Sequence, residues 1–275
     1  MVVQRNRTPP VSYSAERDSL SFGTMASAYL IATTPRTGSS LLCEGLSASG
    51  VAGFPEEYCS AEDSATWRDY AGCSSHIEYF DRYVQRGRSR NGVFGAKLMW
   101  LQFLTWGGDA RRYLGATGAT PDIVRSLTGP YSVVRLSRND RLRQAVSFVR
   151  AGLTSEWARR KTDRDCPADW PAYDADLIRS MMELIDRHEH SWDAMLQTFD
   201  GPVFRITYEA LERDYRGTVK DVLTFLGLKA TRAIPDPVLT RQADDTTEDW
   251  VDRARADLNT PYGRPTAEPS APGSV

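Results

Sequence analysis

The chain has 275 residues, of which 41% are apolar and 25% are charged, a composition that can bury one large globular core. Its net charge of −2 excludes an overall basic field of the kind that holds nucleic acid or an anionic membrane. No apolar run approaches the length of a membrane span, and the N-terminus has no apolar signal segment, so a cytoplasmic protein is expected.

The chain begins with a polar segment that has paired prolines and no sustained period, so residues 1–27 are predicted to form a flexible arm. Residues 28–32 are a short apolar run typical of a buried strand. Residues 33–40 are small and polar, and residues 41–49 repeat apolar side chains at helical spacing up to Gly50. Strand, tight loop and helix are the layout of a phosphate cradle, in which loop N–H groups and the helix N-terminus converge on an anion.

The loop lacks the lysine of an ATP-binding cradle. A Walker A pattern, G-x-x-x-x-G-K-[ST], would need glycine at Thr33 and lysine at Ser39. The missing lysine is the group that reaches the β- and γ-phosphates, so the loop suits a smaller anion such as a phosphosulfate. The alternative is an ordinary turn between a strand and a helix, with its arginine in solvent. The residues expected to hold the anion are Arg36, Thr37, Gly38, Ser39 and Ser40.

A short apolar segment, residues 51–54, precedes Pro55, which favours an extended entry into Glu56 and Glu57. A strand that ends here brings carboxylates to the mouth of the sheet, where open α/β folds place ligands. One of them can act as a general base; the alternative is two solvated acids on a loop. Cys59 follows, but no histidine lies nearby in sequence to activate it as a nucleophile. The 4 cysteines show no C-x-x-C spacing and there are 3 histidines, so no metal site is predicted.

The next elements are a helical segment, a strand and a broken helical segment. Residues 61–90 are predicted to be mostly helical, and residues 93–98 form the second predicted strand. That strand carries Lys97, whose burial costs free energy unless its ammonium meets an anion. The alternative is a surface lysine with its alkyl chain on apolar surface. Residues 101–129 mix helical spacing with expected glycine breaks at Gly107, Gly108, Gly115 and Gly118.

Residues 131–136 are the third predicted strand, with Arg138 directly after it and Ser147 on the helix that follows. Arg141 and Arg143 are second candidates for anion binding, but the favoured expectation is that both are solvated. Residues 159–174, rich in charge and proline, form a connector and a candidate lid. The side chains expected on the buried face of the helix are Leu142, Ala145, Val146, Val149, Leu153 and Trp157.

The C-terminal third continues the same alternation. Residues 176–199 are predicted to form a long helix, with His188 as a core histidine on its apolar stripe. Residues 202–207 are the fourth predicted strand, and residues 208–228 are helical. The Pro/Ser/Gly-rich residues 259–275 are predicted to be disordered.

Four predicted strands that alternate with helices indicate a single α/β domain, residues 28–258, with a central, mainly parallel sheet flanked by helices and a P-loop-like phosphosulfate-binding loop.

Five segments stand in a specific order along the chain: PRTGSS, GVAGFPEEY, FGAKLMW, QAVSF and RQAD. In these segments the chain resembles PAPS-dependent sulfotransferases of the trehalose 2-sulfotransferase type, from about residue 28 to about residue 257. The resemblance implies transfer of a sulfuryl group from 3′-phosphoadenosine 5′-phosphosulfate (PAPS) to a hydroxyl of a small molecule. It further implies that no metal is needed and that the protein is a homodimer.

The resemblance also implies roles for single residues. Glu57, the second of two acidic positions, corresponds to the general base. Lys97 corresponds to a lysine that contacts the transferring group or its bridging oxygen. Met99 stands where many sulfotransferases have a catalytic histidine and cannot accept a proton, which supports the base role of Glu57. Arg138 and Ser147 resemble the pair that holds the 3′-phosphate. The remaining expected contacts are Arg241 and Gln242 to the nucleotide, and Pro35, Phe54, Glu56 and Tyr58 to the acceptor.

Two positions depart from the trehalose-specific pattern, which has an acidic residue in place of Phe54 and glutamine in place of Pro35. Sugar hydroxyls are best held by side chains that hydrogen-bond them, so this part of the pocket is expected to be more apolar. The expected acceptor is therefore less polar than a disaccharide, such as a hydroxylated secondary metabolite in natural product biosynthesis. Two alternatives are a nucleotide kinase or NTPase, which the missing Walker lysine disfavours, and a non-catalytic nucleotide-binding protein.

Overall fold

The structure is a computed structural model that describes residues 25–57, 78, 84–85, 87–154, 156–157, 172–239 and 245–259. Most of the predicted arm, the helical segment 61–90 and the connector 159–174 lie outside these ranges, as do Tyr58, Cys59, Arg241, Gln242 and all but the first residue of the predicted tail. Those expectations stay predictions.

The sheet of the described chain is fully parallel, with strand order β2-β1-β3-β4. The strands are β1 (Ser27–Thr33), β2 (Val93–Met99), β3 (Tyr131–Ser137) and β4 (Val203–Thr207). Thr33 pairs with Met99 and Ser137 pairs with Thr207, so the carboxyl ends of the strands meet at one edge. The predicted single α/β domain with a parallel sheet is confirmed.

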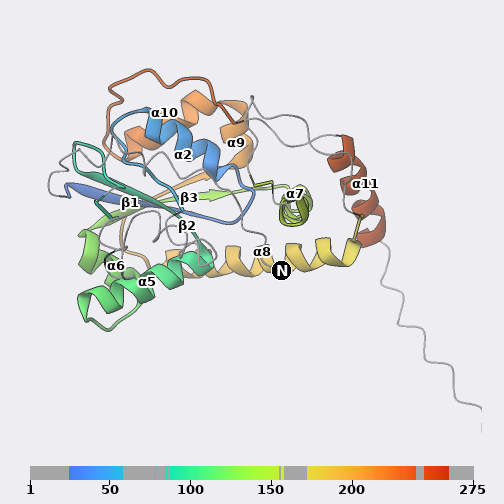
Figure 1. The fold of residues 1–275 in the computed structure, drawn as a ribbon, viewed down its shortest axis with the longest axis horizontal. Helices are drawn as coiled ribbons and strands as arrows, with labels where there is room; N and C mark the ends of the chain where they lie inside the picture. The colour runs from blue at the N-terminus through green and yellow to red at the C-terminus, as the bar shows by residue number, and fades with distance from the viewer. Residues whose placement is uncertain are drawn as a thin grey trace, which may run out of the picture.

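Helices cover both faces of the sheet (Figure 1). On one face lie α2 (Ser39–Ala48), α9 (Tyr208–Arg213) and α10 (Tyr215–Phe225), and on the other lie α5 (Trp100–Leu114), α6 (Thr120–Thr128) and α8 (Ala175–Thr198). Because successive strand residues point to opposite faces, Leu30 joins the core with Trp106 and Trp192, whereas Ile31 joins the core with Leu42 and Val219.

A third apolar cluster lies beyond the ends of the strands. It forms where α7 (Arg141–Thr154) and α11 (Asp245–Asn259) pack on the part of α8 that extends past the sheet (Figure 1). Val149, Ile185 and Trp250 are among its buried members. This cluster fixes α7, which follows β3 in the chain, beside the carboxyl edge of the sheet.

Several local predictions need correction. Gly107 and Gly108 do not break α5, which runs on to Leu114 before Gly115 takes a left-handed φ of 60°. Gly107 instead allows close packing, because a Cβ there would lie 2.3 Å from Thr120 Cγ2. Leu153 is 49% exposed and so leaves the predicted buried face of α7, since its side chain projects beyond the packing of α8 and α11.

Three further differences concern segment ends. Trp157 follows the end of α7. Residues 51–57 form no strand but make one bridge, Glu56 to Ala96, because Gly53 and Pro55 interrupt the extended backbone. The helical segment predicted over residues 208–228 is divided at Asp214, whose side chain accepts a hydrogen bond from the N–H of Gly217 and caps α10.

His188, predicted to be a core histidine, is only partly buried. Burial, and then the charge of Arg187, lower its pKa.

Candidate active site

The loop between β1 and α2 turns through two left-handed residues, Arg36 with φ of 67° and Gly38 with φ of 74°. Glycine is required at the second, because a Cβ there would lie 2.7 Å from Tyr208 Cδ2. Thr33 Oγ1 and Thr37 Oγ1 lie 2.6 Å apart and close the loop from inside. Both hydroxyls are fully buried, so Thr37 uses its side chain to shape the cradle.

Helix α2 starts directly after this loop with no side-chain cap among the described residues and no acid in its first turn. Gly38, the residue before the helix, has no side chain that could cap the first N–H groups. Such a terminus attracts an anion through its donors and its dipole. The predicted cradle is present in backbone geometry.

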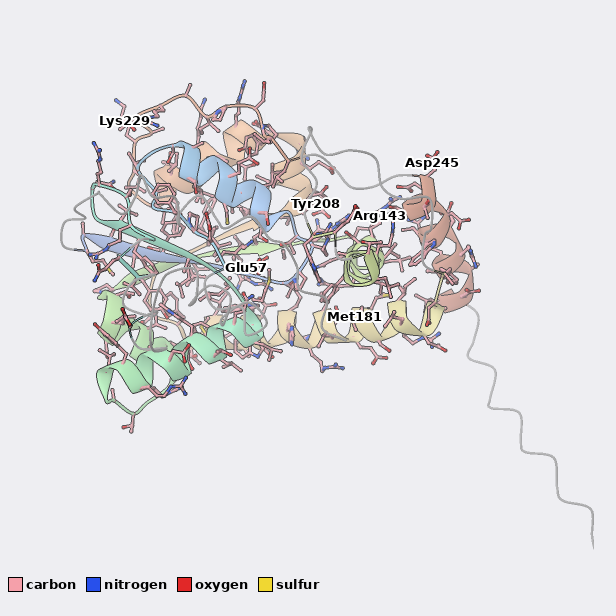
Figure 2. All side chains as sticks on the ribbon, viewed as in Figure 1. Glu57, Arg143, Met181, Tyr208, Lys229 and Asp245 are labelled. Carbon is pink, nitrogen blue, oxygen red and sulfur yellow. The ribbon has the colours of Figure 1, made fainter. Side chains whose placement is uncertain are left out.

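Glu57, labelled in Figure 2, forms an ion pair with Lys97 next to the cradle. Lys97 Nζ lies 2.6 Å from Glu57 Oε1 and donates to Ser40 Oγ at 3.2 Å. Gln102 Nε2 donates to Glu57 Oε2 at 3.1 Å. The amide of Gln102 is oriented by the N–H of Met99, which donates to its Oε1 at 2.9 Å. Both oxygens of Glu57 are thus held.

Lys97 is 6% exposed, so the alternative of a surface lysine is wrong. Burial acts to lower its pKa, but the charge of Glu57 and the hydrogen bond to Glu57 together outweigh burial, and the pKa is raised. The ammonium is therefore protonated at neutral pH. The neighbouring Cys43 is buried, which raises its pKa to about 12 and keeps its thiol neutral.

A second cationic group gathers on the α7 side of the loop. Arg36 Nε donates to Ser147 Oγ at 2.9 Å, and Arg36 Nη1 donates to the carbonyl of Trp157 at 2.5 Å. Arg138 Nη1 donates to the carbonyl of Arg36 at 3.1 Å, and its guanidinium carbon lies 4.4 Å from the centre of the Tyr208 ring. The structure therefore brings Arg36 together with Arg138 and Ser147, which follow it by 102 and 111 residues in the sequence.

The two buried arginines of this cationic group lie in an unfavourable electrostatic environment. Burial, and then the charge of Arg138, lower the pKa of Arg36 to about 10, and burial lowers the pKa of Arg138. Arg138 Nε is buried without a hydrogen-bond partner among the described residues. A bound anion would relieve both costs, and two arginines with a hydroxyl suit a phosphate dianion.

The two nearby arginines predicted to be solvated form ion pairs instead. Arg141 Nε lies 2.9 Å from Asp186 Oδ1. Arg143 pairs with Asp140 at 3.1 Å and donates to Glu248 Oε2 at 2.7 Å, which ties α7 to α11. Figure 2 shows Arg143 on the side of α7 that faces α11. Each arginine serves helix packing, because a partly buried cation needs a carboxylate partner.

The acceptor-side residues are placed less completely. Pro35 is partly buried, and its carbonyl accepts from Gln144 Nε2 at 2.7 Å. Phe54 is partly buried, and its N–H donates to Gly87. The carbonyl of Glu56 accepts from the N–H of Lys97 at 3.2 Å, which sets Glu57 beside the end of β2.

Sequence reasoning missed a buried charged network behind the loop. It contains Glu189 on α8, Arg135 on β3 and Gln144 on α7, which are 8%, 2% and 0% exposed. A signal was available, because Ile185, Glu189 and Trp192 follow one another at helical spacing and place a carboxylate on the buried stripe of α8. An arginine inside the apolar third strand was a second signal.

Comparison with known proteins shows which family shares this architecture. Residues 28–257 match the model of the family described as Stf0 sulphotransferase. The chain belongs to the Stf0 sulphotransferase family. The resemblance and the enzyme class expected from the sequence, a sulfotransferase, are confirmed.

Two curated relatives of this Stf0 sulphotransferase cover most of the chain. Trehalose 2-sulfotransferase of Mycolicibacterium smegmatis is 32% identical over 260 residues, covering 84% of this chain and 95% of the relative. Trehalose 2-sulfotransferase of Mycobacterium tuberculosis is 30% identical over 258 residues, covering 83% and 94%. Among solved structures, a sulfotransferase from Alicyclobacillus acidocaldarius matches with a TM-score of 0.46 and 16% identity, over 86% of this chain and 95% of that one.

Two kinds of feature are absent from the described residues. Their histidine, cysteine and acidic side chains form no group of three that could bind a metal ion. None of their helices is both long and apolar enough to cross a membrane.

Proposed function

We propose that this sulfotransferase moves a sulfuryl group from PAPS to a hydroxyl of a small-molecule acceptor, with Glu57 as general base. The observation that carries the proposal is the placement of Lys97, whose ammonium lies 2.6 Å from Glu57 and 3.2 Å from Ser40 at the head of α2. A carboxylate and an anion-binding helix terminus are thus linked by one buried cation. This is the arrangement that proton removal beside a phosphosulfate requires.

The donor is proposed to span the loop. Its phosphosulfate fits the N-terminus of α2 with Ser39 and Ser40, and its 3′-phosphate fits Arg138 and Ser147. Arg36, expected from the sequence to hold the phosphosulfate, is proposed to join the 3′-phosphate group because its Nε donates to Ser147 Oγ. The buried Nε of Arg138, which has no described partner, supports the second assignment. Arg241 and Gln242, outside the described residues, are proposed to complete the nucleotide site.

The proposed reaction is one in-line substitution at sulfur. The acceptor oxygen forms a bond to sulfur while the bond from sulfur to the bridging oxygen breaks, and adenosine 3′,5′-bisphosphate leaves with that electron pair. Glu57 takes the acceptor's proton, a role worth about 10²–10⁴-fold in rate. Lys97 stabilises the charge that develops on the bridging oxygen, and such donors are often worth about 10²–10³-fold.

The acceptor is proposed to be less polar than trehalose, because Phe54 and Pro35 offer apolar surface where trehalose-specific enzymes carry hydrogen-bonding side chains. A mass-shift screen of hydroxylated secondary metabolites against trehalose, each with PAPS, tests this. Faster transfer to trehalose than to every other alcohol would reject the proposal about the acceptor and leave the proposed chemistry intact.

The decisive experiment incubates the protein with PAPS or ATP and the acceptors of that screen, and identifies the spent nucleotide. We expect adenosine 3′,5′-bisphosphate from PAPS, whereas ADP from ATP would favour a kinase or NTPase. The Glu57→Gln variant should keep nucleotide binding and lose turnover; full turnover would reject Glu57 as the base. Binding without turnover by the unaltered protein in the whole screen would favour a non-catalytic role.

Cytoplasmic location, homodimer formation, the domain limits of residues 28–258 and the lid role of residues 159–174 stay predictions.

A further inference from the structure

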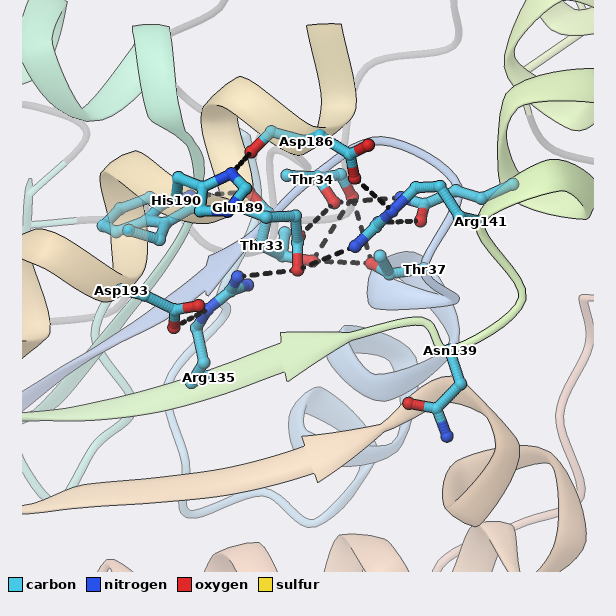
Figure 3. Close-up of polar contacts among 12 residues, drawn as sticks. Thr33, Thr34, Thr37, Arg135, Asn139, Arg141, Asp186, Glu189, His190 and Asp193 are labelled. Carbon is cyan, nitrogen blue, oxygen red and sulfur yellow. Dashed lines mark hydrogen bonds and ion pairs between the residues drawn. The ribbon is translucent and has the colours of Figure 1, made fainter. Parts of the chain in front are cut away.

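Glu189 is a buried carboxylate on α8 whose two oxygens divide their contacts between the cradle loop and two arginines (Figure 3). Glu189 Oε1 accepts from Thr34 Oγ1 at 2.7 Å. Glu189 Oε2 lies 2.9 Å from Arg135 Nη2 and 3.4 Å from Arg141 Nη2. The two arginines compensate the charge of this buried carboxylate, and its other oxygen is directed at the loop.

The hydroxyl of Thr34 joins this carboxylate to α7. While it donates to Glu189, it accepts from Gln144 Nε2 at 2.9 Å. Gln144 presents its amide in this orientation because Arg141 Nη1 donates to Gln144 Oε1 at 2.6 Å, and the same Nε2 also donates to the carbonyl of Pro35. Thr34 is therefore held from α8 on one side and from α7 on the other.

Three consecutive loop residues thus lie against α7. Thr34 and Pro35 contact Gln144, and Arg36 contacts Ser147 at 2.9 Å. Gln144 and Ser147 are three residues apart on one helix and share a face. From the other side, Trp192 of α8 donates to the carbonyl of Thr33 at 2.9 Å. The distance between the loop and Ser147 is set by these contacts.

We propose that Glu189, Thr34 and Gln144 form a positioning triad that fixes the separation between the anion cradle at α2 and the 3′-phosphate group of Arg36, Arg138 and Ser147. This inference rests on the proposed donor site. None of the three residues is assigned to contact the donor; they act through the loop and through α7. Their effect should therefore appear in how much the 3′-phosphate adds to affinity.

The test compares two nucleotides by titration calorimetry. Adenosine 3′,5′-bisphosphate occupies both anion positions, and AMP lacks the 3′-phosphate. The dissociation constant of AMP divided by that of the bisphosphate measures how much affinity is gained by filling both positions at once. In Thr34→Val, which removes the hydroxyl and keeps a branched side chain, we expect this ratio to fall about three- to tenfold, the usual worth of one hydrogen bond. AMP affinity should change less than the bisphosphate affinity.

Thr34→Ser is the matched control, because it restores the hydroxyl and should return the ratio to the wild-type value. A Thr34→Val protein that melts at a lower temperature but keeps the wild-type ratio would overturn the proposal, since the hydroxyl would then serve stability alone. Equal weakening of both nucleotides would also overturn it.

Gln144→Leu repeats the comparison from the α7 side, so the proposal stays testable if Thr34→Val fails to fold. A fall in the ratio is again expected, and an unchanged ratio in a folded protein would contradict the triad. A wild-type protein that binds both nucleotides equally would reject the proposed donor site itself, which separates that failure from a failure of the triad.

Discussion

Lys97 Nζ lies 2.6 Å from Glu57 Oε1 in a position that is 6% exposed, so the proposed base and the proposed stabiliser of the leaving group are paired before any substrate arrives. Proton transfer to Glu57 would neutralise the carboxylate and release the ammonium from its partner at the moment when negative charge develops on the leaving oxygen. The pair thus couples base and cation in one step.

Replacing Lys97 tests this coupling. Lys97→Met keeps a long apolar chain but removes the charge, and we expect turnover to fall about 10²–10³-fold because the developing charge loses a donor. Single-turnover measurements with saturating PAPS would isolate the chemical step. Lys97→Arg keeps the charge and should recover part of the rate, whereas wild-type turnover in the methionine variant would exclude this role.

The same residue makes stability depend on pH. The pKa of Lys97 is raised in the folded state above the ordinary value of 10.5. Its contribution to stability is therefore fully present below that value and is lost as pH rises through the folded pKa. Urea midpoints measured from about pH 8 to 12 should fall more steeply above pH 10.5 for the wild type than for Lys97→Met, and in parallel below it. Parallel curves would show that Lys97 does not contribute in this way.

Gln102 is expected to keep the carboxylate of Glu57 in place once the lysine turns to the donor, because it holds the other oxygen at 3.1 Å. Gln102→Leu should lower turnover about tenfold and leave bisphosphate affinity unchanged, since hydrogen bonds to charged groups are worth about 1.5–3 kcal/mol. Gln102→Glu keeps the acceptor for Met99 but opposes a carboxylate to Glu57, and should lower turnover further. Equal rates in the two variants would contradict this expectation.

Arg138 is expected to bind the 3′-phosphate and, as a buried cation, to lower the stability of the protein when no ligand is bound. Arg138→Met removes a buried cation beside Arg36, so bisphosphate affinity should fall about tenfold or more while the melting temperature of the free protein stays the same or rises. Arg125→Met is the control. Arg125 lies on α6, away from the loop, and forms an exposed ion pair with Asp200. A variant that binds the bisphosphate like the wild type would remove Arg138 from the site.

Two glycines provide a matched comparison of backbone strain. Gly38→Ala meets both a left-handed φ of 74° and the ring of Tyr208, so it should lower the free energy of unfolding by at least about 1 kcal/mol and weaken bisphosphate binding. Gly108→Ala lies in α5 with no atom within 4 Å of the added Cβ and should stabilise by about 0.5–1 kcal/mol. Chemical denaturation of both variants distinguishes them, and equal effects would argue against strain at Gly38.

The sequence predicted the sheet and the strand–loop–helix layout because these depend on local patterns, and it predicted carboxylates near the mouth of the sheet because parallel strands end at one edge. Apolar runs predict parallel strands, and their ends meet by topology, which brings Lys97 and Arg138 to one edge. The sequence did not predict the link from Arg36 to Ser147 or from Thr34 to Glu189, since 111 and 155 residues separate these pairs along the chain. Helical spacing marks Glu189 as buried but does not say which charges it meets.

Helix α11 carries Trp250, Val251 and Ala254, which complete the apolar cluster between α7 and α8. Because α11 is synthesised late, the apolar side of α7 that it covers stays exposed on the nascent chain while about a hundred more residues are added after Val149. Until then, α7, the helix that carries Ser147, packs on α8 without α11. Nascent chains stalled before Asp245 are therefore expected to recruit chaperones at a surface that the finished enzyme buries.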